Sequence, residues 1–569
     1  MKPNFVSLLV VILFSLHCSS ALTARPPNVI LIMADDVSWE AFGCYGAEDY
    51  KTPNIDALAA RGVRYDRAYV QSPVCGASRM STYTGRYVQS HGAAFNGWPL
   101  RVGEYTMGDH LRANDMGCWL VGKTHMAADA DGMARLGLEP DSIIGVRQAE
   151  CGFDVWKRDD GLWAEGPDGF YDERRSPYNE YLKSKGYPGE NPWADFANAG
   201  VDGNKVASGW FMQHADKAAN IAEEDSETPW LTTEAIRFME QATDPWCAHI
   251  SYIKPHWPYI VPAPYHNMYG QEHIQTPVRT DEERTNGHPV YKAFQANVVG
   301  TAFSRDEVRK TVIPAYMGLI KQCDDQLGRL VDWLEETVRD KDTVIVLTSD
   351  HGDYLGDHWL GEKGMLHDPS VRVPLIVYDP SERADASRGT VSNAMVEQID
   401  LTATFIEMAG GEVPTHIVEG RSLLPLLAGE TPDNWRDYAI SEYDYSATPM
   451  RKALGLEIKD ARLMMVCDQR WKMIHAEGGF RPMLFDRDID PGEVNDLGDD
   501  PDYADVVARL YDALHAWARR QSQRVTMSDY KIENGMSRSR RRGITLGVFD
   551  ENDIDPELMS AYSRDIPKA

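Results

Sequence analysis

The chain has 569 residues, of which 43% are hydrophobic, and it carries a formal net charge of −29. This length predicts one large domain and a smaller one, and the hydrophobic content excludes global disorder. The excess of acidic residues argues against nucleic acid as a partner, because phosphate binding needs a basic surface.

Residues 1–24 have the pattern of a signal peptide. Lys2 precedes an apolar run over residues 5–16, and small residues that suit cleavage follow, among them Ala21 and Ala24. The apolar run is too short to span a membrane, and no other stretch of the sequence reaches about 20 apolar residues. We therefore expect a secreted or periplasmic protein without a membrane span.

The predicted catalytic domain, residues 25–432, starts with an apolar run over 28–33 that leads to Asp35 and Asp36. Such a run is typical of a strand buried in a parallel sheet, and ligands bind at the carboxyl ends of these strands. One aspartate there would be interpreted as a turn or cap residue. Two adjacent carboxylates repel each other and favour a shared cation.

The segment over residues 73–87, PVCGASRMSTYTGRY, surrounds Cys75 with small and hydroxylated residues. It predicts a first helical turn over 80–83, with Gly85 as the helix stop. A nucleophile at a helix N-terminus faces free N–H groups that can hold a tetrahedral oxyanion, and Arg79 adds a forked donor. The alternative is a buried structural cysteine beside an incidental arginine.

Lys123 and His125 follow a short predicted strand over 119–121. Their spacing of two lets both side chains point the same way from an extended segment. The alternative is a solvated lysine beside a surface histidine.

His256 stands between two prolines after a predicted strand over 246–253, which places it on a stiff segment. It is either a functional histidine or a packed loop histidine. Asn96, in a predicted loop over 91–98, is a candidate for substrate contact.

A second buried strand, predicted over 343–349, ends in Asp350 and His351. These two residues converge with Asp35 and Asp36 only if both strands are neighbours in one parallel sheet. Oxygen-rich sites favour Ca²⁺ or Mg²⁺, while one histidine also admits Mn²⁺ or Zn²⁺.

The rest of the chain offers fewer candidate functional residues. Residues 127–227 are polar and irregular, and they predict long loops on the active-site face. Residues 433–523 predict a small subdomain of antiparallel strands followed by a helix. The polar tail, 524–569, is either an oligomerisation arm or a solvated end.

Taken together, these elements resemble the sulfatase family of the alkaline-phosphatase-like superfamily over roughly residues 28–521. Cys75 and Arg79 match the signature Cys-x-Pro-Ser-Arg, in which the cysteine is oxidised to formylglycine, and Ala77 stands at the proline position. The resemblance implies an α/β fold, with a large mostly parallel sheet flanked by helices and a small C-terminal antiparallel α+β subdomain.

The resemblance also implies residue roles. Lys123 and His125 match a Lys-x-His pair that binds the sulfate and the aldehyde hydrate, and Lys363 matches a second lysine that holds the sulfate. His256 matches a histidine that contacts the ester or its leaving group. One divalent cation, Ca²⁺ before Mn²⁺, Mg²⁺ or Zn²⁺, is expected at the aspartate and histidine ligands.

The expected function is the hydrolysis of a sulfate ester, such as that of a sulfated polysaccharide, after maturation by formylglycine-generating machinery. The stretches KPHWPYIVPAPYHNMY and SDHGDYLGDH also resemble phosphonate monoester hydrolases, which makes a phosphonate monoester or phosphodiester hydrolase the alternative. A carbohydrate-binding pseudoenzyme is a third hypothesis, supported only by Ala77. The tail leaves a homo-oligomer open.

Overall fold

The computed structural model describes residues 25–161, 176–243, 245–520, 525–535 and 548–554, with the single residues 556 and 559. The expected signal peptide lies outside the described residues, as does most of the tail. Within the described ranges, no helix is both long and apolar enough to cross a membrane.

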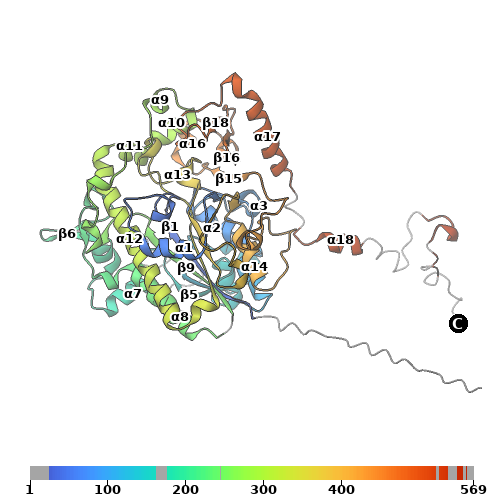
Figure 1. The fold of residues 1–569 in the computed structure, drawn as a ribbon, viewed down its shortest axis with the longest axis horizontal. Coiled ribbons are helices and arrows are strands. Elements are labelled where there is room, and N and C mark those ends of the chain that lie inside the picture. The colour runs from blue at the N-terminus through green and yellow to red at the C-terminus, as the bar shows by residue number, and fades with distance from the viewer. Residues whose placement is uncertain are drawn as a thin grey trace, which may run out of the picture.

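An eight-stranded sheet lies at the centre of the molecule, in the order β13-β2-β12-β11-β1-β9-β4-β5 (Figure 1). The strands are β1 (Asn28–Asp35), β2 (Val63–Tyr65), β4 (Gly117–Gly122), β5 (Asp154–Arg158), β9 (Trp246–Pro255), β11 (Thr343–Ser349), β12 (Leu375–Tyr378) and β13 (Thr390–Ser392). All neighbours from β11 to β5 are parallel, whereas β12 runs antiparallel to β11 and β2. The predicted mostly parallel sheet is confirmed.

Strands β1 and β11 are the two central apolar runs, and every residue in both is buried. They pair in parallel from Asn28 opposite Thr343 to Ala34 opposite Ser349. Their carboxyl ends therefore meet at one edge of the sheet, as the sequence predicted for its two ligand pairs.

Helices cover both faces of this sheet. Alternate residues of β1 point to opposite sides, so this strand contributes to the core on each face. Val29 and Leu31 belong to one core, and Ile30 and Ile32 belong to another. The first core includes α2 (Cys75–Thr84), α4 (Met107–Arg112) and α14 (Asp400–Met408), and the second includes α1 (Pro53–Arg61), α8 (Glu227–Gln241) and the 31-residue α12 (Asp306–Glu336).

Residues 127–227 hold more regular structure than the predicted loops. They contain α5 (Ala130–Leu136), α6 (Ile143–Ala149), β5, α7 (Pro177–Ser184) and a hairpin of β6 (Ala199–Asp202) and β7 (Lys205–Ser208). Strand β5 is an edge strand of the sheet with the sequence DVWKR, and it escaped prediction because three of its five residues are charged and it forms no apolar run. The segment 162–175 lies outside the described residues.

The C-terminal part forms a four-stranded antiparallel sheet of β15 (Ala439–Asp444), β16 (Arg462–Cys467), β17 (Trp471–Ala476) and β18 (Met483–Asp486). Helix α17 (Ala504–Ala518) packs on it (Figure 1). The sequence predicted the last three strands and the helix, but it did not predict β15.

The remaining elements are short. The two-residue strands are β3 (Ala68–Tyr69) with β14 (Val396–Glu397), and β8 (Ala218–Ala219) with β10 (Val261–Pro262). The short helices are α3 (Val88–His91), α9 (Asp281–Thr285), α10 (Pro289–Gln295), α11 (Val298–Phe303), α13 (Asp368–Val371), α15 (Leu424–Leu427), α16 (Pro449–Ala453) and α18 (Asp529–Gly535).

Candidate active site

Helix α2 carries the candidate nucleophile at its first position. The helix begins at Cys75, five residues earlier than the predicted first turn at Met80, and its first backbone hydrogen bond runs from Ser78 N to Val74 O (2.9 Å). It ends where predicted, because Gly85 adopts a left-handed conformation with φ 66°. Cys75 therefore faces the positive end of the helix dipole.

Asn96 explains why the helix begins so early. Its Oδ1 accepts a hydrogen bond from the free N–H of Gly76 (2.8 Å) and so caps the helix from a separate loop. A Cβ atom on Gly76 would lie 3.0 Å from this oxygen, so a glycine suits the close approach. The cap places Asn96 beside the candidate nucleophile.

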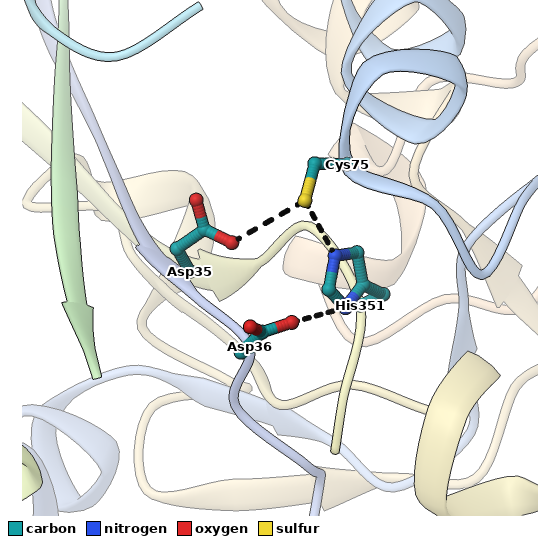
Figure 2. A group of neighbouring side chains, drawn as sticks. All are labelled: Asp35, Asp36, Cys75 and His351. Atoms are coloured by element: carbon teal, nitrogen blue, oxygen red, sulfur yellow. Dashed lines mark hydrogen bonds and ion pairs between the residues drawn. The ribbon is translucent and has the colours of Figure 1, made fainter. Parts of the chain in front are cut away.

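The Cys75 sulfur is completely buried among charged groups (Figure 2). It lies 3.0 Å from Lys363 Nζ, 3.0 Å from His351 Nε2 and 3.7 Å from Asp35 Oδ1. Burial opposes ionisation, but Lys363 and His351 hold the pKa of the thiol well below its usual value. These neighbouring cations therefore favour a negative charge at the position of the sulfur.

Four side chains at this edge of the sheet offer metal ligands. One ligand atom each from Asp35, Asp36, Cys75 and His351 lie within 4.8 Å of one another, and His351 Nδ1 is 2.9 Å from Asp36 Oδ1 (Figure 2). Burial would raise the pKa of Asp36, but Lys363 and His351 outweigh it and keep the pKa well below its usual value. Asp36 is thus ionised, as metal binding requires.

Asp350 adjoins this cluster. Its Oδ2 lies 3.7 Å from His351 Nε2, and its Oδ1 accepts a hydrogen bond from the Asp36 N–H (3.3 Å). Burial raises the pKa of Asp350 to about 6 against the effect of Arg79, and the charge of Asp35 adds to the increase. Three crowded, buried carboxylates and an imidazole fit a hard divalent cation, which would relieve this repulsion.

Arg79 binds the carboxylates. Its guanidinium contacts Asp350 Oδ2 (2.8 Å) and Asp35 Oδ2 (3.1 Å), and it also donates to Ser251 Oγ (2.7 Å) and to the Lys123 carbonyl (3.1 Å). All of these groups are buried. In this arrangement Arg79 orients two candidate ligands.

Lys123 and His125 follow the carboxyl end of β4. Lys123 is buried and forms an ion pair with Asp35 through its Nζ atom. His125 has a left-handed backbone, with φ 55°, and its N–H donates to Asp160 Oδ1 (3.3 Å). Its Nδ1 atom is buried and has no hydrogen-bond partner among the described residues, so the ring can bind an incoming group.

His256 follows the carboxyl end of β9, on the same edge of the sheet. Its Nδ1 lies 2.6 Å from the Trp257 carbonyl oxygen and therefore carries a proton, which leaves Nε2 facing Asp36 Oδ2 at 3.6 Å. Burial, with the charge of Lys123, lowers the pKa of His256.

The sequence-predicted residues thus meet at one edge of the central sheet. Sequence reasoning missed Ser251, which binds Arg79, and Asp160, which binds the backbone of Thr124 and His125. Asp160 follows β5, so recognition of that strand as a sheet member would have pointed to it.

A model of the sulfatase family matches residues 27–411. The chain belongs to the sulfatase family. A second model, described as the C-terminal part of N-sulphoglucosamine sulphohydrolase, matches residues 356–520. The predicted sulfatase-family membership is confirmed.

Relatives and solved structures cover most of this sulfatase. The multifunctional alkaline phosphatase superfamily protein PehA of Trinickia caryophylli is 29% identical over 532 residues, covering 89% of this chain and 97% of PehA. An arylsulfatase of Clostridium perfringens is 27% identical over 497 residues, covering 85% and 92%. The phosphonate monoester hydrolase SpPMH from Silicibacter pomeroyi superposes with a TM-score of 0.76 at 28% identity, covering 88% and 97%.

Proposed function

We propose that this sulfatase hydrolyses sulfate monoesters of sulfated carbohydrates outside the cytoplasm, with oxidised Cys75 as the nucleophile. The observation that carries the proposal is the position of the Cys75 sulfur, 3.0 Å from Lys363 and next to the candidate metal cluster. Positive charge thus lies where negative charge would develop during attack on the sulfur of the sulfate ester.

A divalent cation would be held by Asp35, Asp36, Asp350 and His351, whose buried oxygens and imidazole favour Ca²⁺, with Mn²⁺, Mg²⁺ and Zn²⁺ as alternatives. The cation would supply Lewis-acid charge to the sulfate oxygens. Oxidation of Cys75 to formylglycine by maturation machinery would supply a hydroxyl nucleophile in the hydrated aldehyde.

The chain's own side chains complete the chemistry. Lys123 and Lys363 neutralise the sulfate oxygens, and Arg79 keeps Asp35 and Asp350 in place. His256 has its Nδ1 proton held by the Trp257 carbonyl, so its Nε2 is the atom that meets the leaving oxygen. The Nδ1 atom of His125, which has no hydrogen-bond partner among the described residues, makes this ring the candidate base for release of the product.

The similarity to PehA and SpPMH supports a second candidate, a phosphonate monoester or phosphodiester hydrolase that uses the same groups. The arylsulfatase of C. perfringens and an N-acetylglucosamine-6-O-sulfatase of Bacteroides thetaiotaomicron, 25% identical over 555 residues, favour sulfate esters. A pseudoenzyme is disfavoured, because Cys75, the cationic side chains Lys123 and Lys363 and the candidate metal ligands lie together. The proposal also includes export of the protein from the cytoplasm and a homo-oligomer formed through the tail, residues 524–569.

Peptide mass spectrometry across Cys75, followed by assays of matched sulfate and phosphonate esters, tests the proposal. We expect the mass of the aldehyde, and turnover of sulfate esters that Cys75→Ala abolishes. Unmodified Cys75 in a host with maturation machinery would overturn the formylglycine mechanism. Faster turnover of phosphonates than of matched sulfates would establish the second candidate instead.

A further inference from the structure

The turn that follows β9 carries His256, and it has few backbone donors of its own. Two of its residues, Pro255 and Pro258, lack an N–H group. Pro255 lies opposite Asp35 in the pairing of β9 with β1, so the turn begins beside a candidate metal ligand. Because unpaired buried carbonyls cost free energy, the carbonyls of this turn need donors from side chains.

Lys254 supplies these donors. Its Nζ atom donates to the carbonyl oxygens of His256 (3.3 Å) and Pro258 (3.0 Å). Its own carbonyl accepts a hydrogen bond from the thiol of Cys323 on α12 (3.5 Å). An ammonium group has three donors, so one lysine can serve several carbonyls at once. Lys254 thus holds the turn at two points and is itself held by α12.

The position of this lysine is unusual for its residue type. Lys254 is 7% exposed, and in the described part of the chain it forms no ion pair. Lysine is rarely buried without a paired carboxylate. Burial lowers the pKa of Lys254, although the charge of the buried Glu227 acts in the opposite direction. The partners of the Lys254 ammonium are therefore the carbonyls of the turn rather than a counterion.

The hydrogen bonds of Lys254 flank the contact that orients His256. The carbonyl of Trp257 lies between the two carbonyls that Lys254 binds, and it is 2.6 Å from His256 Nδ1. Each peptide unit is planar, so a carbonyl has little freedom to rotate when its neighbours on both sides are held. The arrangement keeps His256 Nε2 directed at Asp36 Oδ2, 3.6 Å away.

We propose that Lys254 is a positioning residue that acts through His256 on the leaving oxygen of the ester. The inference rests on the proposed ester hydrolysis, and it adds a residue to that reaction. On this function, Nε2 of the protonated imidazole gives its proton to the leaving oxygen as the ester bond breaks, which yields the free alcohol and a neutral imidazole. That imidazole keeps its Nδ1 proton on the Trp257 carbonyl, and Lys254 transfers no proton itself.

A comparison of leaving groups tests this role. Phenyl sulfate needs more help from an acid than 4-nitrophenyl sulfate does, because phenolate is the stronger base. We expect Lys254→Met to lower kcat/KM about 30-fold for phenyl sulfate and less than about threefold for 4-nitrophenyl sulfate. The phenyl and 4-nitrophenyl esters of methylphosphonate provide the same comparison for the second candidate function.

Two further variants separate positioning from a structural role. His256→Ala should change the ratio of the two rates in the same direction, and addition of Lys254→Met to it should change the ratio no further. Lys472→Met is the matched control, since Lys472 of β17 is also buried and donates to Asp368 Oδ1 (2.6 Å). This control should lower the melting temperature and leave the ratio at the wild-type value.

The ratio is measured within one preparation, so it does not depend on the fraction of folded protein. If Lys254→Met yields no folded protein, Lys254→Gln provides the same test, because glutamine retains two N–H donors without the charge. We expect Lys254→Gln to change the ratio in the same direction by a smaller factor.

The outcomes distinguish the inference from the proposed function. An unchanged ratio in a folded Lys254 variant, or equal losses on both esters, would overturn the positioning role while ester hydrolysis stands. A further change of the ratio in the double variant would also overturn it, because Lys254 would then act on a group other than His256. A protein that cleaves only the phosphonates, with the expected change of ratio in Lys254→Met, would support the positioning role and overturn the sulfatase function.

Discussion

The amine of Lys363 lies 3.0 Å from the sulfur of Cys75, although 288 residues separate the two in the sequence. The same amine lies 3.1 Å from Asp36 Oδ1. Lys363 therefore connects the nucleophile position with the candidate metal ligands, and it neutralises charge on both.

Replacement of Lys363 tests this connection. We expect Lys363→Ala to lower kcat about 10²- to 10³-fold, because a charge aimed at the reacting group is lost in a buried site. Lys363→Arg should recover part of the rate. Steady-state kinetics with a sulfate ester gives the result, and the exposed Lys459→Ala is the control that should behave as wild type. A kcat within about threefold of the wild-type value would rule out the assigned role.

Removal of divalent cations should abolish activity and lower the melting temperature. Without a cation, the carboxylates of Asp35, Asp36 and Asp350 repel one another in a buried site. Dialysis against a chelator, elemental analysis and calorimetry provide the measurements, and re-addition of single cations identifies the metal. Full activity in protein shown by elemental analysis to be metal-free would contradict the ligand assignment.

Glycine at position 122 is expected to be essential for the position of Lys123. Gly122 has φ 117°, and a Cβ atom there would lie 2.1 Å from the Ser251 carbonyl oxygen. Gly122→Ala should therefore lower the free energy of unfolding by about 3 kcal/mol or more, and reduce activity as well. Denaturant unfolding measures the loss.

The control for this substitution is Gly92→Ala. Gly92 also has a positive φ, 79°, but a Cβ atom would meet nothing described within 4 Å. This substitution should lower the free energy of unfolding by about 1 kcal/mol, the value expected for the backbone conformation alone. Equal losses in the two variants would show that the contact with Ser251 has no effect.

Glu442 should make stability depend on pH. Burial raises the pKa of this β15 side chain to about 7, although the Gln89 N–H and Arg520 act in the opposite direction. The unfolded chain releases this proton near pH 4.5, so the folded state loses stability as pH rises from about 4.5 to 7. Glu442→Gln should remove a penalty of about 3 kcal/mol at pH 8 and have little effect at pH 4.

Melting temperatures of the two proteins from pH 4 to 8 provide the measurement. The exposed Glu457→Gln is the control, and it should leave the pH profile unchanged. A Glu442→Gln variant with the same pH profile as wild type would contradict the buried-acid explanation.

The centre of the fold could be predicted because its signal is local. Strands β1 and β11 are continuous apolar runs that end in candidate ligands, so both the sheet and the metal residues followed from the sequence. Strand β5 gave no such signal, because its sequence DVWKR is mostly charged and contains no apolar run. Asp160, which follows it, was therefore missed as well.

Other features depend on distant partners. Helix α2 begins at Cys75 because Asn96 caps Gly76 across 20 residues, a contact that no helix-start pattern contains. Likewise, the Trp210 ring contacts that of Trp257, which lies 47 positions later in the chain. Such contacts are set by tertiary packing rather than by local propensity.

The complete burial of Cys75 bears on the order of its proposed oxidation and of folding. Its sulfur is 0% exposed once α2 has packed against the sheet, so the proposed maturation machinery would reach it more readily in an unfolded chain. On the proposed function, Cys75 would therefore be oxidised before the chain folds. The fraction of active protein would then depend on the rate of this oxidation relative to the rate of folding.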